Sequence, residues 1–216
     1  TNDMIGKSTE EYSGFSDFLD PQKNLTSTVG ANAVPDFFMG DKGNIQASVY
    51  GRIRNINDFI SNVQSHSASD EVKQKALGQA YFFRAWCYYL LMKWYGGVPL
   101  VSEVQEPVPS SFTPRASARE TKNFILADLD ESARLLAPYT MNGGWGGGNF
   151  GRVTTGTALA LKGRVLLLWA SPLFNRANEQ SRWTEAYQTM RAEKDSIDAC
   201  GYHLYQTGNN VNGTDF

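Results

Sequence analysis

The residue types that most often carry out catalysis are scarce in this chain, and their spacing matches no familiar catalytic pattern. His66 and His203 are the only histidines, and neither has a second metal ligand at helical spacing. Neither a Gly-x-Ser-x-Gly turn nor a His-Glu-x-x-His helix is present. Asp128, Asp130 and Glu131 are close in sequence, but helical spacing is expected to spread them over a solvent-exposed face. The sequence therefore predicts no catalytic residues and no enzyme.

Aromatic residues stand near Asn and Asp in several loops, and this combination suits sugars. An aromatic ring stacks on the C–H side of a pyranose, while amides and carboxylates form hydrogen bonds with its hydroxyl groups. The same polar residues are common in ordinary turns, so the pattern alone is a weak signal. The predicted ligand-binding residues are Phe37, Phe38, Asp41, Asn44 and Trp145.

Trp145 lies within a run of glycines, Gly143-Gly-Trp-Gly-Gly-Gly148. This run is not a phosphate-binding loop, because it lacks the Lys-Ser/Thr ending and follows a helix where a strand is required. Two interpretations stay open. The run is either a flexible surface loop, or a loop that displays Trp145 to a ligand, since a solvent-facing Trp among glycines has little to pack against locally.

The composition excludes several classes of function. Twenty basic and 22 acidic residues leave a formal net charge of -2, which removes the usual electrostatic reason to expect nucleic-acid or polybasic membrane binding. No apolar run approaches the roughly 18 residues of a membrane-spanning helix. Cys87 and Cys200 form neither a disulfide framework nor a zinc site, and both are expected in the core. No cofactor is predicted, and no EF-hand pattern supports calcium at the Asp-rich loops.

Helical periodicity and capping signals predict the elements that must position these loops. In the first predicted helix Ile53 and Ile60 belong to an apolar stripe, and Asn57 is assigned to the polar surface. The second is expected to begin with Asp70 as its N-cap, to end at Gly96-Gly97, and to carry apolar residues on two sides, which indicates packing between neighbours. One of these sides includes Phe83, Cys87 and Trp94. The third is expected to begin with a capping box of Ser117 and Glu120, and the last to carry an apolar stripe with Tyr187, Met190 and Ile197. The predicted ranges are about 49–65, 70–95, 117–137, 154–171 and 182–200. The fold class is therefore all-α.

A faint internal repeat indicates how the helices pair. Ala80-x-x-x-Arg84 matches Ala160-x-x-x-Arg164, 80 residues further on, and each lies in a long apolar helix followed by a loop and a partner helix. The spacing favours tetratricopeptide-like helix pairs with long inserted loops. Arg84 and Arg164 are both expected to form buried charge-assisted hydrogen bonds to backbone or carboxylate groups.

One long segment also resembles a known family. The run from Lys75 to Leu100, KALGQAYFFRAWCYYLLMKWYGGVPL, is similar to the RagB/SusD family of outer-membrane nutrient-binding lipoproteins of Bacteroidetes. In that family an Arg-Ala-x-x-Tyr-Tyr helix leads to an aromatic-Gly-Gly-Val-Pro-Leu turn. Four other segments resemble the family in the same order, so that the resemblance covers about residues 50–205. These segments are 50–60, 113–133, 151–164 and 183–204.

The resemblance implies a fold, a function and a partner. It implies a SusD-like α/α superhelix that captures oligosaccharides at the cell surface, with inserted loops forming the binding site. It also implies delivery to a TonB-dependent outer-membrane transporter of the SusC type, and an N-terminal lipid anchor that this chain does not contain. The family motifs found here are scaffold motifs, so they do not assign ligand-binding residues.

Three parts of the chain are expected. Residues 1–48 form an irregular segment, residues 49–205 form the helical scaffold, and residues 206–216 begin a truncated C-terminal half. Because members of the family are typically more than twice as long, we expect this chain to be a fragment.

Two other functions stay open. One is a helical-repeat adaptor that binds a peptide or protein partner through its concave helix faces. The other is part of an all-α glycoside hydrolase, because paired carboxylates can meet in space without being close in sequence.

Overall fold

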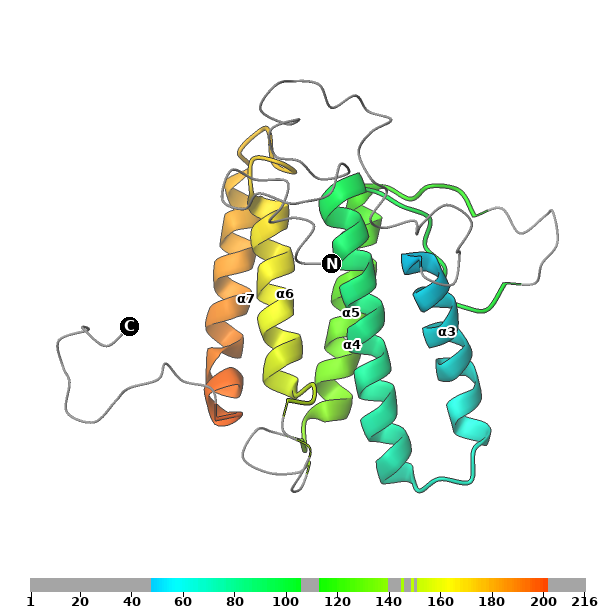
Figure 1. The fold of residues 1–216 in the computed structure, drawn as a ribbon. Helices are drawn as coiled ribbons and strands as arrows, with labels where there is room; N and C mark the ends of the chain where they lie inside the picture. The colour runs from blue at the N-terminus through cyan, green and yellow to red at the C-terminus, as the bar shows by residue number, and fades with distance from the viewer. Residues whose placement is uncertain (1–47, 106–112, 140–144, 146–148, 150, 202–216) are drawn as a thin grey trace, which may run out of the picture. The chain divides into compact units, whose positions relative to one another are not determined.

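The computed structural model describes residues 48–105, 113–139, 145, 149 and 151–201, and these residues form helices joined by loops. No strand occurs among them; Pro99 and Arg115 form one isolated antiparallel bridge. The elements are α3 (Val49–Asn62), the 3-10 helix η3 (Val63–Ser65), α4 (Asp70–Tyr95), α5 (Ala118–Leu136), α6 (Thr155–Ala170) and α7 (Gln180–Ala199) (Figure 1). The predicted all-α class is confirmed.

The chain divides into two compact units, residues 1–52 and 53–216. In the first unit only residues 48–52 are described, and there Ser48 Oγ accepts a hydrogen bond from the Gly51 amide at 2.9 Å. In the second unit α4, α5, α6 and α7 lie side by side in chain order, and consecutive helices run antiparallel (Figure 1). This arrangement agrees with the predicted helix pairs. None of the described helices is both long and apolar enough to cross a bilayer.

Capping explains where three of these helices begin. Ser117 and Glu120 form the predicted capping box at α5, and Thr154 caps α6 together with Thr157. The N-cap of α4, in contrast, is Ser69 and not Asp70 as predicted, because the Ser69 side chain accepts the hydrogen bond of a first-turn amide. Asp70 is the first helical residue, where its charge still favours the positive end of the helix dipole.

Helix α4 is buried on several sides, but less completely than its sequence predicts. Cys87, Tyr88 and Leu91 are buried, as expected for a helix between neighbours. Phe83 and Trp94, which share the predicted apolar face with Cys87, are exposed instead. The reason is that α4 packs mainly on α5, so part of its circumference has no described neighbour.

Two glycines bring paired helices close together. A Cβ on Gly78 of α4 would lie 2.6 Å from Cγ of Leu136 on α5. The Gly78 carbonyl oxygen accepts a hydrogen bond of 2.7 Å from the hydroxyl of buried Ser132. On α6, a Cβ on Gly163 would lie 1.9 Å from the sulfur of Met190 on α7. Each pair therefore contains one point where only a glycine fits without repacking.

Candidate functional site

Trp145, the predicted ligand-binding residue that the structure describes, is half-buried and makes specific contacts. Its indole Nε1 donates a hydrogen bond of 3.2 Å to the Val153 carbonyl oxygen. Its ring lies 5.4 Å from the ring of Tyr139, centroid to centroid, at an interplanar angle of 43°. The glycine-rich segment therefore does not leave this side chain without packing partners, which differs from the prediction of a purely solvent-facing ring.

Two cationic groups lie against these rings. The Lys75 ammonium is 4.7 Å from the centre of the Tyr139 ring and 5.7 Å from that of Trp145. The Arg152 guanidinium carbon is 5.4 Å from the centre of the Trp145 ring. Both distances to Trp145 are within the range of cation–π attraction. Lys75 also forms an ion pair of 2.6 Å with Glu71, one helical turn earlier.

Two amide side chains complete the group. Asn149 Nδ2 donates to the Trp145 carbonyl oxygen at 2.8 Å, and Asn149 Oδ1 accepts from Arg152 Nε at 2.6 Å. Arg152 Nη1 also donates to Gln79 Oε1 at 3.4 Å. We call this set the Trp145 cluster. Its members are Lys75, Gln79, Tyr139, Trp145, Asn149 and Arg152.

Three helix ends position the Trp145 cluster. Lys75 and Gln79 are one turn apart on α4, and the Gln79 amide donates to the Lys75 carbonyl oxygen at 3.1 Å. Tyr139 follows α5, and its backbone amide donates to the Leu136 carbonyl oxygen at 2.7 Å. Arg152 lies two residues before Thr154, the N-cap of α6. The cluster therefore combines two side chains of α4 with residues from the segment between α5 and α6.

The Trp145 cluster brings together groups that complement a sugar. The half-buried ring of Trp145 can contact the C–H face of a pyranose, while the ring of Tyr139, only 5% exposed, packs against it. The amide and cationic groups can bond the hydroxyl or acidic groups of the sugar. Phe37, Phe38, Asp41 and Asn44 lie outside the described residues, so their predicted role stays a prediction. The role of Trp145 as a ligand contact also stays a prediction.

The predicted ligand-binding residues leave out five members of this cluster: Lys75, Gln79, Tyr139, Asn149 and Arg152. Arg152 was visible only as part of the scaffold segment that begins at Gly151, and Lys75 only as the start of the family-like run. No local spacing links these two positions to Trp145. A sequence signal was available for Tyr139 and Asn149, since they stand on either side of the glycine-rich run that contains Trp145.

A second polar group lies inside the helical scaffold, around Arg84. The Arg84 guanidinium donates two hydrogen bonds to the Asp128 carboxylate, at 2.8 and 2.7 Å. Its Nη1 donates to Asn57 Oδ1 at 2.9 Å and to the Ser102 carbonyl oxygen at 3.2 Å. Arg84 and Asp128 are only 6% and 5% exposed. This group joins α3, α4, α5 and the loop after α4, and we call Arg84, Asp128 and Asn57 the Arg84 hub.

The hub corrects three predictions. The buried charge-assisted bond of Arg84 is confirmed, but its carboxylate partner is Asp128, which was predicted on a solvent-exposed face. Asn57, predicted on the surface, is buried because its amide also donates to the Val101 carbonyl oxygen at 2.9 Å. Arg164, predicted to be buried like Arg84, is exposed on α6. Its side of the helix has no described neighbour that could accept its hydrogen bonds.

Burial and charge act in opposite directions on the pKa values in the hub. Burial favours the neutral Asp128 carboxyl and raises its pKa, while the bidentate bond and charge of Arg84 work against that rise. Burial alone would lower the pKa of Arg84, but the hydrogen bond and charge of Asp128 outweigh it and raise that pKa. Arg84 therefore stays cationic, as a structural tie between helices.

The other acidic residues flagged by the sequence form surface ion pairs. Asp130 lies 2.7 Å from Lys162, which also pairs with Glu193 at 2.6 Å. Glu131 pairs with Arg134 at 2.6 Å, and that hydrogen bond lowers the pKa of Glu131. Within the part of the chain that the structure describes, no three His, Cys, Asp or Glu residues gather in a way that could hold a metal ion.

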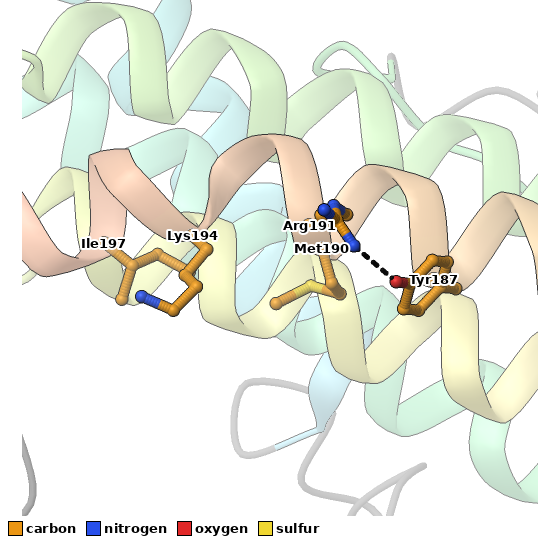
Figure 2. A pocket seen from close by; sticks show the side chains of 5 residues that line it. All are labelled: Tyr187, Met190, Arg191, Lys194 and Ile197. Carbon is orange, nitrogen blue, oxygen red and sulfur yellow. Dashed lines mark hydrogen bonds between the residues drawn. The ribbon is translucent and has the colours of Figure 1, made fainter.

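Helix α7 presents a second surface of interest. A groove of about 330 Å³ runs along it, lined by Tyr187, Met190, Arg191, Lys194 and Ile197. Figure 2 shows these side chains projecting from one helix, with Arg191 donating to the Tyr187 hydroxyl at 2.8 Å. The sequence predicts an apolar stripe here, yet Tyr187 is 62% exposed. Ala186 is the one buried residue of α7, so most side chains of this helix, including those of the groove, are at least partly exposed.

Comparison with known protein families identifies the family to which this fold belongs. Residues 18–142, more than half of the chain, match the model of a SusD-like family described as starch-binding and associating with the outer membrane. A segment of 61 residues is 34% identical to SusD-like protein P38 from Formosa agariphila. That match covers 28% of this chain and 12% of the relative.

Solved structures give the same assignment. A SusD-like protein from Bacteroides fragilis is 28% identical and superimposes with a TM-score of 0.59, covering 74% of this chain and 28% of the relative. Surface glycan-binding protein A from Bacteroides uniformis is 21% identical with a TM-score of 0.55, covering 73% of this chain and 32% of the relative. The latter likeness shows the fold alone. In each case this chain spans less than a third of the relative's length.

Proposed function

We propose that this chain, which belongs to the SusD-like family, binds carbohydrate and that the Trp145 cluster is part of its binding site. The observation that carries the proposal is the contact of half-buried Trp145 with Lys75 and Arg152, where one aromatic surface lies beside hydrogen-bond donors and packs on buried Tyr139. Such a surface suits a ligand that has both C–H faces and polar groups, and sugars have this property.

The family supports the same class of ligand. The family is described as starch-binding, and the Bacteroides uniformis relative is a surface glycan-binding protein. We propose that the chain acts at the cell surface, in association with the outer membrane. We further propose that it is held there by a lipid anchor.

The binding is proposed to occur without catalysis, as a capture step. The protein would hold an oligosaccharide and deliver it to a SusC-like TonB-dependent transporter in the outer membrane. A shallow site of stacking and hydrogen bonds gives modest affinity, which allows a captured ligand to leave again. Affinity electrophoresis tests the binding, and co-purification of the native protein with a barrel transporter tests the delivery.

The binding experiment compares Trp145→Ala with Trp94→Ala in gels that contain amylopectin, pullulan or alginate. Trp94 is a matched control because it is exposed on α4, near the end opposite to Lys75. Removing an aromatic side chain that anchors a ligand costs about 2 kcal/mol or more, roughly a 30-fold loss of affinity. We expect that loss for Trp145→Ala and no change for Trp94→Ala. Equal retention of both variants would argue against this site.

The alternative of a helical-repeat adaptor is kept because of the apolar groove on α7. The paired substitution Tyr187→Ser with Met190→Ser removes the apolar character of that groove. If carbohydrate binding at the Trp145 cluster is the function, glycan retention stays unchanged in this variant. A loss of glycan retention would move the site to α7.

A further inference from the structure

We infer that the Trp145 cluster selects sugars that carry a negative charge, with Arg152 as the residue that reads the acidic group. The inference rests on the proposed carbohydrate binding and adds the class of sugar. The first observation is the positive charge of the Trp145 cluster. Lys75 and Arg152 contribute two positive charges near Trp145, whereas Glu71 supplies one negative charge, to Lys75.

Arg152 has a charge that no described residue neutralises. Among the described residues its side chain donates only to neutral oxygens, those of Asn149 and Gln79. No Asp or Glu of the described chain lies within ion-pair distance of it. The side chain is also exposed, so a ligand can reach it without displacing protein atoms.

The surroundings of Trp169, where cations also lie beside an aromatic ring, provide a comparison for the charge of Arg152 in the Trp145 cluster. Arg119, Lys122 and Arg182 all lie within 5.6 Å of the Trp169 ring centre. There, however, Arg182 pairs with Glu179 at 3.0 Å and Lys122 pairs with Glu185 at 3.5 Å. The Trp169 ring is also only 6% exposed. Two of the three cations beside buried Trp169 are thus paired with carboxylates, whereas Arg152 beside half-buried Trp145 is held by amides.

The guanidinium group of Arg152 determines which acidic groups the cluster can bind. A planar guanidinium matches the carboxylate of a uronic acid through two parallel hydrogen bonds, and it also binds a sulfate ester. The two amides hold Arg152 in place, which reduces the entropy lost when a ligand binds. The ring of Trp145 beside it can support the body of the same sugar.

The test is affinity electrophoresis of the whole chain at pH 7 in gels that contain alginate, dextran sulfate or amylopectin. These probes separate carboxylate, sulfate and neutral sugars. The chain has a net charge of -2, so general attraction to polyanions is not expected. We expect stronger retention by alginate than by amylopectin, and retention by alginate that falls as salt rises from about 50 to 500 mM.

The variants isolate the role of Arg152. We expect Arg152→Gln to weaken retention by alginate about tenfold and to weaken retention by amylopectin much less, because glutamine keeps a hydrogen-bond donor and only the charge is lost. Arg152→Lys should restore part of the retention by alginate. Arg164→Gln is the matched control, since Arg164 is an exposed arginine on α6 away from the cluster.

The outcomes separate this inference from the function on which it rests. The chain could be retained equally by amylopectin and alginate, with retention lost in Trp145→Ala but not in Arg152→Gln. That result would support carbohydrate binding and overturn the selection of charged sugars. Retention by dextran sulfate alone, equally reduced by Arg164→Gln, would also overturn it as nonspecific attraction. If no gel retains the wild-type chain, both the inference and the proposed function fail.

Discussion

Arg84 and Arg152 are both held by an asparagine side chain and both lie beside aromatic rings, but they differ in burial and in carboxylate partners. Arg84 is buried, forms a bidentate bond with Asp128 and is tied to Asn57. Arg152 is exposed, is tied to Asn149 and has no carboxylate partner among the described residues. The first arginine has all its strong interactions inside the protein, whereas the second keeps its charge available to something outside it.

This difference shows that the role of an arginine depends on whether it is buried or exposed. A buried guanidinium without a carboxylate would cost several kcal/mol, so Arg84 and Asp128 must stay together. An exposed guanidinium is hydrated, and its lack of a partner costs little. The Arg84 hub is therefore expected to control stability, and the Trp145 cluster to control binding. Four variants or conditions can break or sharpen this contrast.

The largest effect is expected for Arg84→Leu. This change leaves Asp128 as a buried carboxyl without its partner, and breaking such a pair costs about 3–5 kcal/mol of unfolding free energy. Urea unfolding followed by circular dichroism measures it. The double variant Arg84→Met with Asp128→Leu should recover most of the loss, because no charge is then left buried. A loss below about 1 kcal/mol for Arg84→Leu alone would contradict the role of the hub.

The two asparagines are expected to differ next. Asn57→Ala removes an acceptor of Arg84 and a donor to Val101, both in the interior, which should cost about 1–3 kcal/mol. Asn149→Ala removes a partner of exposed Arg152 and should change stability by less than about 0.5 kcal/mol. The same unfolding experiment compares them. Equal losses would mean that the Trp145 cluster is as structural as the hub.

A smaller effect is expected from alkaline pH, through Tyr88 beside the hub. Its hydroxyl accepts from the Val101 amide at 2.7 Å, and burial raises the pKa of Tyr88 to about 12. With the folded pKa above the unfolded value near 10, this contribution is complete below pH 10 and is lost as pH rises toward 12. At pH 11 the loss is on the order of 1 kcal/mol. Unfolding at pH 8 and pH 11 should show it, and Tyr88→Phe should lack it.

The smallest effect on stability is expected for Arg152→Leu. An exposed arginine whose partners are neutral amides should contribute within about 0.5 kcal/mol, well below the cost of Arg84→Leu. The melting temperature of the variant, measured beside that of the wild type, provides the comparison. A drop as large as that of Arg84→Leu would show that Arg152 holds the end of the helices together, and the contrast between the two arginines would disappear.

Local sequence signals were enough to predict most of the scaffold. The capping box at Ser117 and Glu120 and the stop at Gly96 are short-range features, and both occur where they were expected. Burial of single polar residues was harder to predict. Asn57 and Asp128 have the pattern of surface residues on their own helices. They are buried because Arg84, on a third helix, forms hydrogen bonds with both.

The residues of the candidate site were even harder to predict from local sequence. Trp145 could be singled out because it stands among glycines, but its neighbours come from the start of α4, the end of α5 and the segment before α6. Their meeting depends on the antiparallel order of the helices, which periodicity indicates only in outline. Arg164 shows the opposite error, since a repeat in sequence suggested a burial that the packing of α6 does not provide.

The close approach of Gly163 to Met190 connects helix α6 with the groove on α7. Met190 places its sulfur against Gly163, and the same side chain lines the groove. A methyl group added at Gly163 would push the thioether outward and make the groove shallower. The shape of that outer surface is therefore set in part by a residue on a neighbouring helix that is itself buried beneath it.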